Sequence, residues 1–222
     1  MAEAAVFLRA LHIADGTLPI GRFSHSYGVE AWLEAHPEAG PEELRELVET
    51  TLAGSVATLD GAAGALAHRA AVRADHDALR RLDADLTARK LSGPARSAST
   101  LCGRRLAELA QGLGAGELVS GLAHCNLAVV EGALGAALGI GRGETVLIAI
   151  RGHAAAMLSA AVRLGRLGTA RSQELLFELT PRLEACAAEA DAVSTDGLRS
   201  TLPELELHAA RHAHRDARQF MS

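Results

Sequence analysis

The chain has 222 residues, of which 49% are hydrophobic and 3% aromatic, and its formal net charge is -5 at pH 7. This length is enough for one sizeable domain, whose core must be built from alanine, leucine, valine and glycine because aromatic residues are scarce. The negative charge argues against a protein of nucleic acid or membrane surfaces, since such proteins carry a basic patch.

The cysteines and the apolar stretches indicate where the protein resides. Its three cysteines are Cys102, Cys125 and Cys186. They are far apart, odd in number and include no C-x-x-C pair, so we expect a reducing cytoplasm. The N-terminus lacks the long apolar run of a signal peptide. Residues 122–150 are the most apolar region but contain three charged residues, whereas a membrane span needs about 20 nearly uncharged ones, so we expect a soluble protein.

Prolines, glycines and apolar spacing divide the first half of the chain into helices. The predicted helices are Ala4–Ala14, a segment capped by Ser24 or Ser26 and ending at His36, a third from Pro41 to Leu52, then Asp75–Leu91 and Ala95–Leu113. The last three have the apolar periodicity of amphipathic helices or a clear glycine or proline boundary. Beyond Leu52, small residues at Ala53, Ala57 and Gly61 predict that a neighbouring helix comes close.

The second half of the chain contains the two most apolar predicted helices, 117–140 and 144–165, which we expect at the centre of the fold. Glycines at 132, 135 and 139 recur on one face of the first, and each costs about 1 kcal/mol in helix propensity, so close packing is the expected compensation. A helix over 172–190 should be kinked or split by Pro181, and 195–203 should be a loop before a last helix from Glu204.

No alternating strand pattern of convincing length and no internal repeat occurs in the chain. The sequence therefore predicts an all-α fold of roughly eight to ten helices, bundle-like and forming one domain over residues 1–222. Because the chain is apolar yet poor in aromatic residues, we expect it to bury further surface between subunits as a homodimer.

The stretch 18–30 is the part of the chain that helix packing alone does not explain. Pro19 fixes its own backbone and disfavours a helical Leu18, so a helix from upstream should stop there. Gly21 permits a turn that a side chain would resist. The sequence predicts a rigid bend between two helices, with polar side chains gathered on it.

This stretch resembles the N-terminal signature of the UreF family of urease accessory proteins. The matching residues are Leu18, Pro19, Gly21, Phe23, Ser24, Ser26, Gly28 and Glu30. The other end, 210–222, is similar to the family's closing segment, in which an Arg-His pair is followed by Arg-(any)-Phe-(any)-Ser at the terminus. Two motifs in the right order near opposite ends are more specific than either alone, and the resemblance covers the whole chain.

The resemblance implies an all-helical homodimer with no catalytic activity of its own. It implies that the chain binds a second accessory protein, UreD or UreH, and recruits the nickel-carrying GTPase UreG, so that the complex delivers nickel to apo-urease. On this view the chain holds no cofactor stably, and the complex handles the nickel. The residues expected to bind partners are Pro19, Gly21, Phe23, His25, Ser26, Gly28, Glu30, Arg211, His212, Arg218 and Phe220.

The tail near 211–222 has little apolar surface of its own, and such termini are usually mobile. Phe220 is one of only four phenylalanines, and an aromatic residue so placed is a natural anchor for a partner's groove. We expect the tail to order when the second accessory protein binds, with Phe220 in a pocket and Arg211 and Arg218 paired to acidic groups.

The chief alternative is a metal-binding or metalloenzyme helical protein that uses histidine and glutamate. Glu204, His208 and His212 stand four residues apart on one predicted helix face, and imidazole is a good ligand for nickel or zinc. A solvated polar helix is the favoured interpretation there, because nothing closes a coordination sphere. His25 is likewise better interpreted as a hydrogen-bonded or surface group than as a ligand. No E-x-x-H occurs, which argues against a carboxylate-bridged bundle enzyme.

The sequence also lacks nucleotide-binding and hydrolase motifs. It contains no G-K-[ST] phosphate loop and no G-x-S-x-G or H-E-x-x-H motif, so any GTP used in the reaction should bind to a partner. Four arginines on two successive helices suit recognition of carboxylates, but an ordinary solvated helix face fits them equally well. These are Arg89, Arg96, Arg104 and Arg105.

Overall fold

The computed structural model of the chain describes residues 2–201 and 219–221. The α-helices in these ranges are α1 (Ala2–Ala14), α2 (Val29–Ala35), α3 (Pro41–Thr51), α4 (Ala62–Val72), α5 (His76–Arg89), α6 (Gly93–Gly112), α7 (Gly116–Val119), α8 (Leu127–Ala137), α9 (Arg142–Arg163), α10 (Thr169–Glu178) and α11 (Thr180–Ala192). Short 3-10 turns are η1 (Arg22–Ser24) and η3 (Thr195–Gly197), and η2 (Leu52–Gly61) is a π-helix. No strand occurs in the described ranges, so the prediction of an all-α fold is confirmed.

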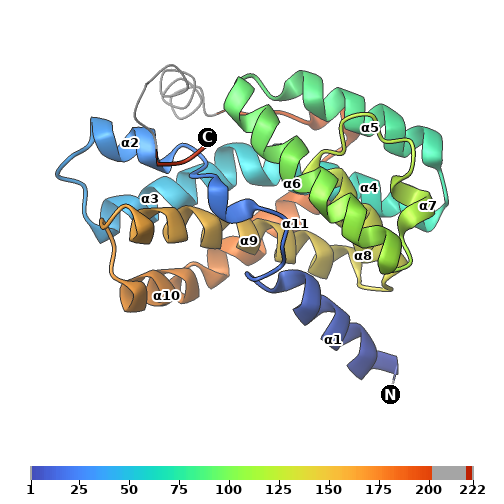
Figure 1. Cartoon of the computed structure of the whole chain (residues 1–222), viewed down its shortest axis with the longest axis horizontal. Helices are drawn as coiled ribbons and strands as arrows, with labels where there is room; N and C mark the ends of the chain where they lie inside the picture. The colour runs from blue at the N-terminus through green and yellow to red at the C-terminus, as the bar shows by residue number, and fades with distance from the viewer. Residues whose placement is uncertain (1, 202–218, 222) are drawn as a thin grey trace.

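Helix α9 runs through the middle of the molecule, and α2, α3, α8, α10 and α11 pack around it (Figure 1). Two apolar clusters form the core. One joins α3, η2, α9, α10 and α11, and the other joins α4, α5, α6 and α8. Within the described part of the chain only α9 is long and apolar enough to cross a membrane, but half of its apolar window is buried inside the fold, as in the core helix of a globular domain.

Residues 41–72 form one uninterrupted helical rod, because the backbone keeps right-handed helical angles at both junctions of η2. Its middle ten residues are wound as a π-helix, a form that is rare and often found at functional sites. A Cβ built on Gly61 would lie 3.1 Å from both the Ala190 Cβ and the Ile150 Cδ1. The small-residue stretch therefore lets α9 and α11 approach this rod, as predicted for Gly61.

The glycine face of α8 is used inside the protomer. A Cβ on Gly132 would lie 2.3 Å from the Gly64 carbonyl oxygen of α4, and one on Gly135 would lie 2.3 Å from the Thr145 hydroxyl of α9. Gly139 departs from the prediction, since it has φ 73° just after the helix and ends α8 rather than extending its face. Two of the three glycines thus provide the close packing predicted from their spacing.

The prediction of one helix over 117–140 is wrong, because residues 120–126 form a loop between α7 and α8. The carboxylate of Asp83, on α5 and fully buried, accepts the backbone N–H groups of His124, Cys125 and Asn126 at 2.8, 3.1 and 2.7 Å. Asn126 donates from its side chain back to Asp83 at 2.9 Å. The loop has left-handed turns at Gly121 and Cys125 (φ 84° and 55°), so these backbone bonds replace helical ones.

Helix α6 lies against this loop so closely that it has no room for a side chain at Gly103. A Cβ there would be 1.8 Å from the Cys125 carbonyl oxygen, whereas one at Gly112 of the same helix would meet nothing within 4 Å. We therefore expect Gly103→Ala to lower the free energy of unfolding by about 1–3 kcal/mol, the usual cost of overpacking. Gly112→Ala is the matched control, and urea unfolding of both variants measures the difference. Equal stability of the two would contradict the close packing of α6 on the loop.

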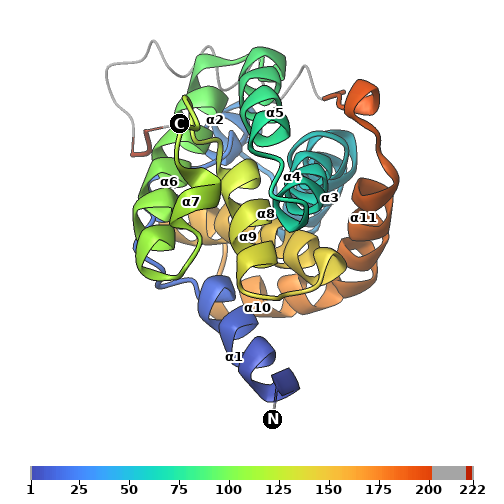
Figure 2. The ribbon, with the colours of Figure 1, turned by 90° about the vertical axis from the view of Figure 1, so that its right-hand side faces the viewer.

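Other boundaries agree with the sequence. The 172–190 prediction is split at Pro181, the second residue of α11, where α10 ends at Glu178. Helix α1 projects from one end of the helical body in Figures 1 and 2, leaving Phe7, Leu8 and Leu11 more than half exposed on its outer face. The predicted last helix from Glu204 lies outside the described residues.

Candidate partner-binding site

The bend predicted at 18–30 is present, but its turns arise differently. Gly21 (φ 81°) lies before η1, and Tyr27 and Gly28 (φ 55° and 88°) lead into α2. Gly28 itself is the N-cap of α2, and no side chain caps that helix, so the expected capping by Ser24 or Ser26 is not found. A tyrosine in the left-handed region is strained, which is typical of functional segments held by their surroundings.

The predicted partner-binding residues of the bend divide into an inner and an outer set. Gly28 and three polar residues are buried, and the polar residues His25, Ser26 and Glu30 are 2%, 0% and 6% exposed. Burial lowers the pKa of His25 below its ordinary value, so this ring is a neutral interior group. In contrast, Pro19 is exposed and Phe23 is 72% exposed. The buried residues shape the bend, and Phe23 is the side chain that it presents to solvent.

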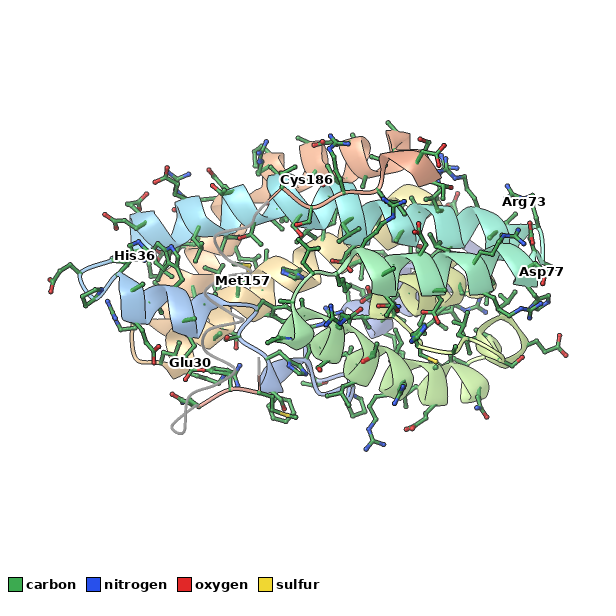
Figure 3. All side chains as sticks on the ribbon, turned by 90° about the horizontal axis from the view of Figure 1, so that it is seen from above. Glu30, His36, Arg73, Asp77, Met157 and Cys186 are labelled. Atoms are coloured by element: carbon green, nitrogen blue, oxygen red, sulfur yellow. The ribbon has the colours of Figure 1, made fainter. Side chains whose placement is uncertain are left out.

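Glu30 joins this bend to the other end of the chain. Its two carboxylate oxygens accept the backbone N–H groups of Gln219 and Phe220 at 2.8 and 3.2 Å. Met221 then donates its backbone N–H to the Ser24 carbonyl oxygen at 2.9 Å. Figures 1 and 3 show these C-terminal residues lying beside α2 and the labelled Glu30. The two segments that resemble family motifs, about 190 positions apart, therefore meet in space.

The prediction that Phe220 anchors in a groove of a partner protein is wrong, because the ring is buried in its own chain. Its ring is 4% exposed and belongs to the apolar cluster of α3, α9 and α11. The Arg163 guanidinium lies over the ring, 4.2 Å from its centre, as a cation–π contact. Hydrophobic burial and two charge-assisted hydrogen bonds to Glu30 thus hold residues 219–221 on their own chain.

The remaining tail predictions stay predictions. Arg211, His212 and Arg218, and the weak metal candidates His208 and His212, lie outside the described residues, as does most of the tail near 211–222. Within the described ranges, no group of three histidine, cysteine or acidic side chains is placed to hold a metal ion.

The four arginines considered as a partner face are not alike. Arg89 donates to Asp85 and to the Leu198 carbonyl oxygen, and Arg96 donates to the carbonyl oxygens of Lys90 and Leu91. The guanidinium groups of Arg89 and Arg96 are thus engaged in contacts within their own chain. Arg104 and Arg105 are exposed. Arg105 forms an ion pair with Glu108 on the surface, and such pairs contribute little to the free energy of folding.

Beneath the bend lies a set of charged residues that sequence reasoning did not select. Arg22 of η1 forms an ion pair with Glu131 of α8, and Lys90 binds both carboxylate oxygens of Asp60 at 2.7 and 2.9 Å. Burial raises the pKa of Glu131, and Arg22 offsets part of that effect. One signal was present, because a lone glutamate within an apolar helix requires a buried cationic partner.

Comparison with known proteins identifies the family to which this helical chain is similar. The family model described as UreF matches residues 39–180. The urease accessory protein UreF of Yersinia enterocolitica (serotype O:8, biotype 1B) is 32% identical over 226 residues, covering 98% of this chain and 99% of that protein. UreF of Yersinia pestis (strain Pestoides F) is 31% identical with the same coverage. The chain belongs to the UreF family.

The UreF model match begins after the bend and ends before the closing residues. The full-length similarity to the Yersinia UreF proteins, in contrast, covers 98% of the chain. In this UreF-family chain, the family model covers the helical body and the similarity to the relatives extends beyond it toward the chain ends. The contact of Glu30 with residues 219–221 joins the two motifs.

Proposed function

We propose that this chain is a scaffold for assembly of the urease metallocentre. In this proposal it binds a second accessory protein, UreD or UreH, and recruits or regulates the GTPase UreG, so that nickel is inserted into apo-urease. Membership of the UreF family supports the setting. The observation that carries the proposal is the contact of the bend with residues 219–221, which builds one surface from both family motifs.

This composite surface has the chemistry of a protein-binding patch. Phe23 and Met221 are 72% and 60% exposed, and the Met221 N–H bond to Ser24 places their backbones side by side. Large apolar side chains exposed together on a surface are typical of interaction sites. The backbone beneath Phe23 and Met221 is held by three buried residues, His25, Ser26 and Glu30. The surface is therefore formed before a partner arrives.

We infer further that the chain is non-enzymatic and acts in the cytoplasm as a homodimer. The sequence has no phosphate loop, so GTP is bound and hydrolysed by the partner, and nickel is handled by the complex. Gly132 and Gly135 are occupied by contacts within the protomer, so a dimer must use another surface. The outer face of α1, where Phe7, Leu8 and Leu11 are exposed, is such a surface.

Replacing Phe23 tests the proposed docking surface. We expect Phe23→Ser to weaken binding of the second accessory protein at least tenfold, because a large apolar anchor is lost, while circular dichroism and thermal stability stay unchanged. Phe177→Ser removes an exposed ring of the same kind from α10 and is the matched control, with an expected loss of less than twofold. Biolayer interferometry with immobilised partner measures both. If both variants bind the partner with equal affinity, the bend is not part of the interface.

A further inference from the structure

A partly open cavity of about 130 Å³ lies between the bend and the helical body. It is bounded by the residues around Tyr27, by the π-helix η2, by the start of α6 and by α8 and α9. An engineered cavity of about 150 Å³ in another protein holds benzene, so this space is large enough for a molecule of about six non-hydrogen atoms. The proposed scaffold role does not use it.

Three polar side chains line the cavity without a hydrogen-bond partner among the described residues. They are the hydroxyl of Tyr27, the hydroxyl of Ser55 and the imidazole of His153. Tyr27 and His153 pack on each other with ring centres 4.4 Å apart. All three side chains are half-buried and face the cavity. Polar groups withdrawn from bulk solvent in native proteins are almost always satisfied, by protein, water or ligand. Their convergence on one space indicates that the space holds a polar occupant.

The charges around the cavity favour an occupant that accepts hydrogen bonds. Asp60 is neutralised by Lys90 and Glu131 by Arg22, so neither carboxylate is available to a cation. Lys90 has three N–H groups and makes two bonds, both to Asp60, and Arg22 has five and makes one described bond. With the hydroxyls of Tyr27 and Ser55, donors at the cavity exceed free acceptors. Burial lowers the pKa of His153 to about 4, so its ring adds no charge at pH 7.

Most of the remaining lining is hydrocarbon, although Thr51, Ser92 and Ser99 also line the cavity. Apolar side chains from three elements form much of the wall, namely Val56 and Leu59 of η2, Leu127 of α8 and Ile150 of α9. An inorganic oxyanion has no apolar surface to bury against such a wall, whereas a short hydrocarbon chain packs against it favourably.

We propose that this cavity is a binding site for a short-chain monocarboxylate, with its carboxylate near Tyr27, Ser55 and Lys90 and its hydrocarbon tail against η2 and α9. The proposal is independent of the scaffold function, because it concerns the isolated chain. The chosen probe is butyrate, whose six non-hydrogen atoms match the cavity.

Ligand-observed NMR of the purified full-length chain at pH 7 tests the site. We expect butyrate to bind at least tenfold more tightly than butyramide, which has the same shape without the charge, and than inorganic phosphate, which has no tail. Tyr27→Phe and Ser55→Ala should each weaken butyrate binding several-fold. Ser159→Ala, at an exposed position of α9, should leave it unchanged.

Circular dichroism checks that the variants are folded. If Tyr27→Phe perturbs the bend, Ser55→Ala alone is used to test the site. Absence of butyrate binding at millimolar concentration would overturn the proposal. Equal binding of butyrate and butyramide would overturn the assignment to a carboxylate. Unchanged binding by both folded cavity variants would show that butyrate binds elsewhere. None of these results depends on urease or its other accessory proteins, so the scaffold function is tested separately.

Discussion

Replacing Asp83 with alanine is expected to lower the free energy of unfolding by about 4 kcal/mol or more. The fully buried carboxylate accepts three consecutive backbone N–H groups of the 120–126 loop and the side chain of Asn126. Removing it leaves several buried donors unsatisfied, each costing about 1–3 kcal/mol. Asp83→Asn keeps one acceptor oxygen and should fall between the variant and the wild type.

Asp77→Ala is the matched control for Asp83→Ala, because Asp77 is on the same helix but pairs with Arg80 on the surface with a side chain that is 72% exposed. Its expected cost is below about 1 kcal/mol. Chemical unfolding at pH 7 followed by far-ultraviolet circular dichroism measures all three variants. If Asp83→Ala is no less stable than Asp77→Ala, the loop between α7 and α8 is organised by something other than this carboxylate.

Phe220→Ala is expected to release residues 219–221 from α2 while the helical body stays folded. The ring is buried in the core cluster, and burying a phenylalanine contributes about 1.5–3 kcal/mol. Since 1.4 kcal/mol is a factor of ten, amide exchange at residue 220 should accelerate about tenfold to a hundredfold. Met221→Ala changes an exposed neighbour and should leave that exchange rate unchanged.

Hydrogen–deuterium exchange of the full chain measures this release, and Glu30→Gln gives an independent variant. Glu30→Gln replaces one accepting oxygen by an amide group that cannot accept, so it should also accelerate exchange at residues 219 and 220. If the amide of residue 220 exchanges equally fast in wild type and in Phe220→Ala, the closing residues are not held by this ring.

Much of the fold followed from local patterns. The apolar spacing of 41–52, the Gly93–Pro94 start of α6 and Pro181 each act within a few residues, and the structure has helices or boundaries there. The break at 120–126 could not be found in this way, because its cause is Asp83, some forty positions away. The π-helix also lacks a local signal, since its residues read as a continuation of an ordinary helix.

The candidate site was predicted in part for the same reason. The bend at 18–30 follows from Pro19 and Gly21, which act locally. Its partner inside the chain does not, since Phe220 in a polar terminal segment has no pattern that distinguishes an internal anchor from one for another protein. Its destination depends on Glu30 and Arg163, which only the folded chain brings to it.

Under the proposed scaffold function, this chain is needed for nickel insertion into urease. The most direct test of this requirement is co-expression of a urease operon with and without the chain, followed by nickel analysis and activity assays of the purified urease. Wild-type chain should give nickel-loaded, active urease, and omission should give apo-urease in equal amount. Phe23→Ser should resemble omission, and Phe177→Ser should resemble the wild type. Fully nickel-loaded urease in the absence of the chain would contradict the proposed scaffold function.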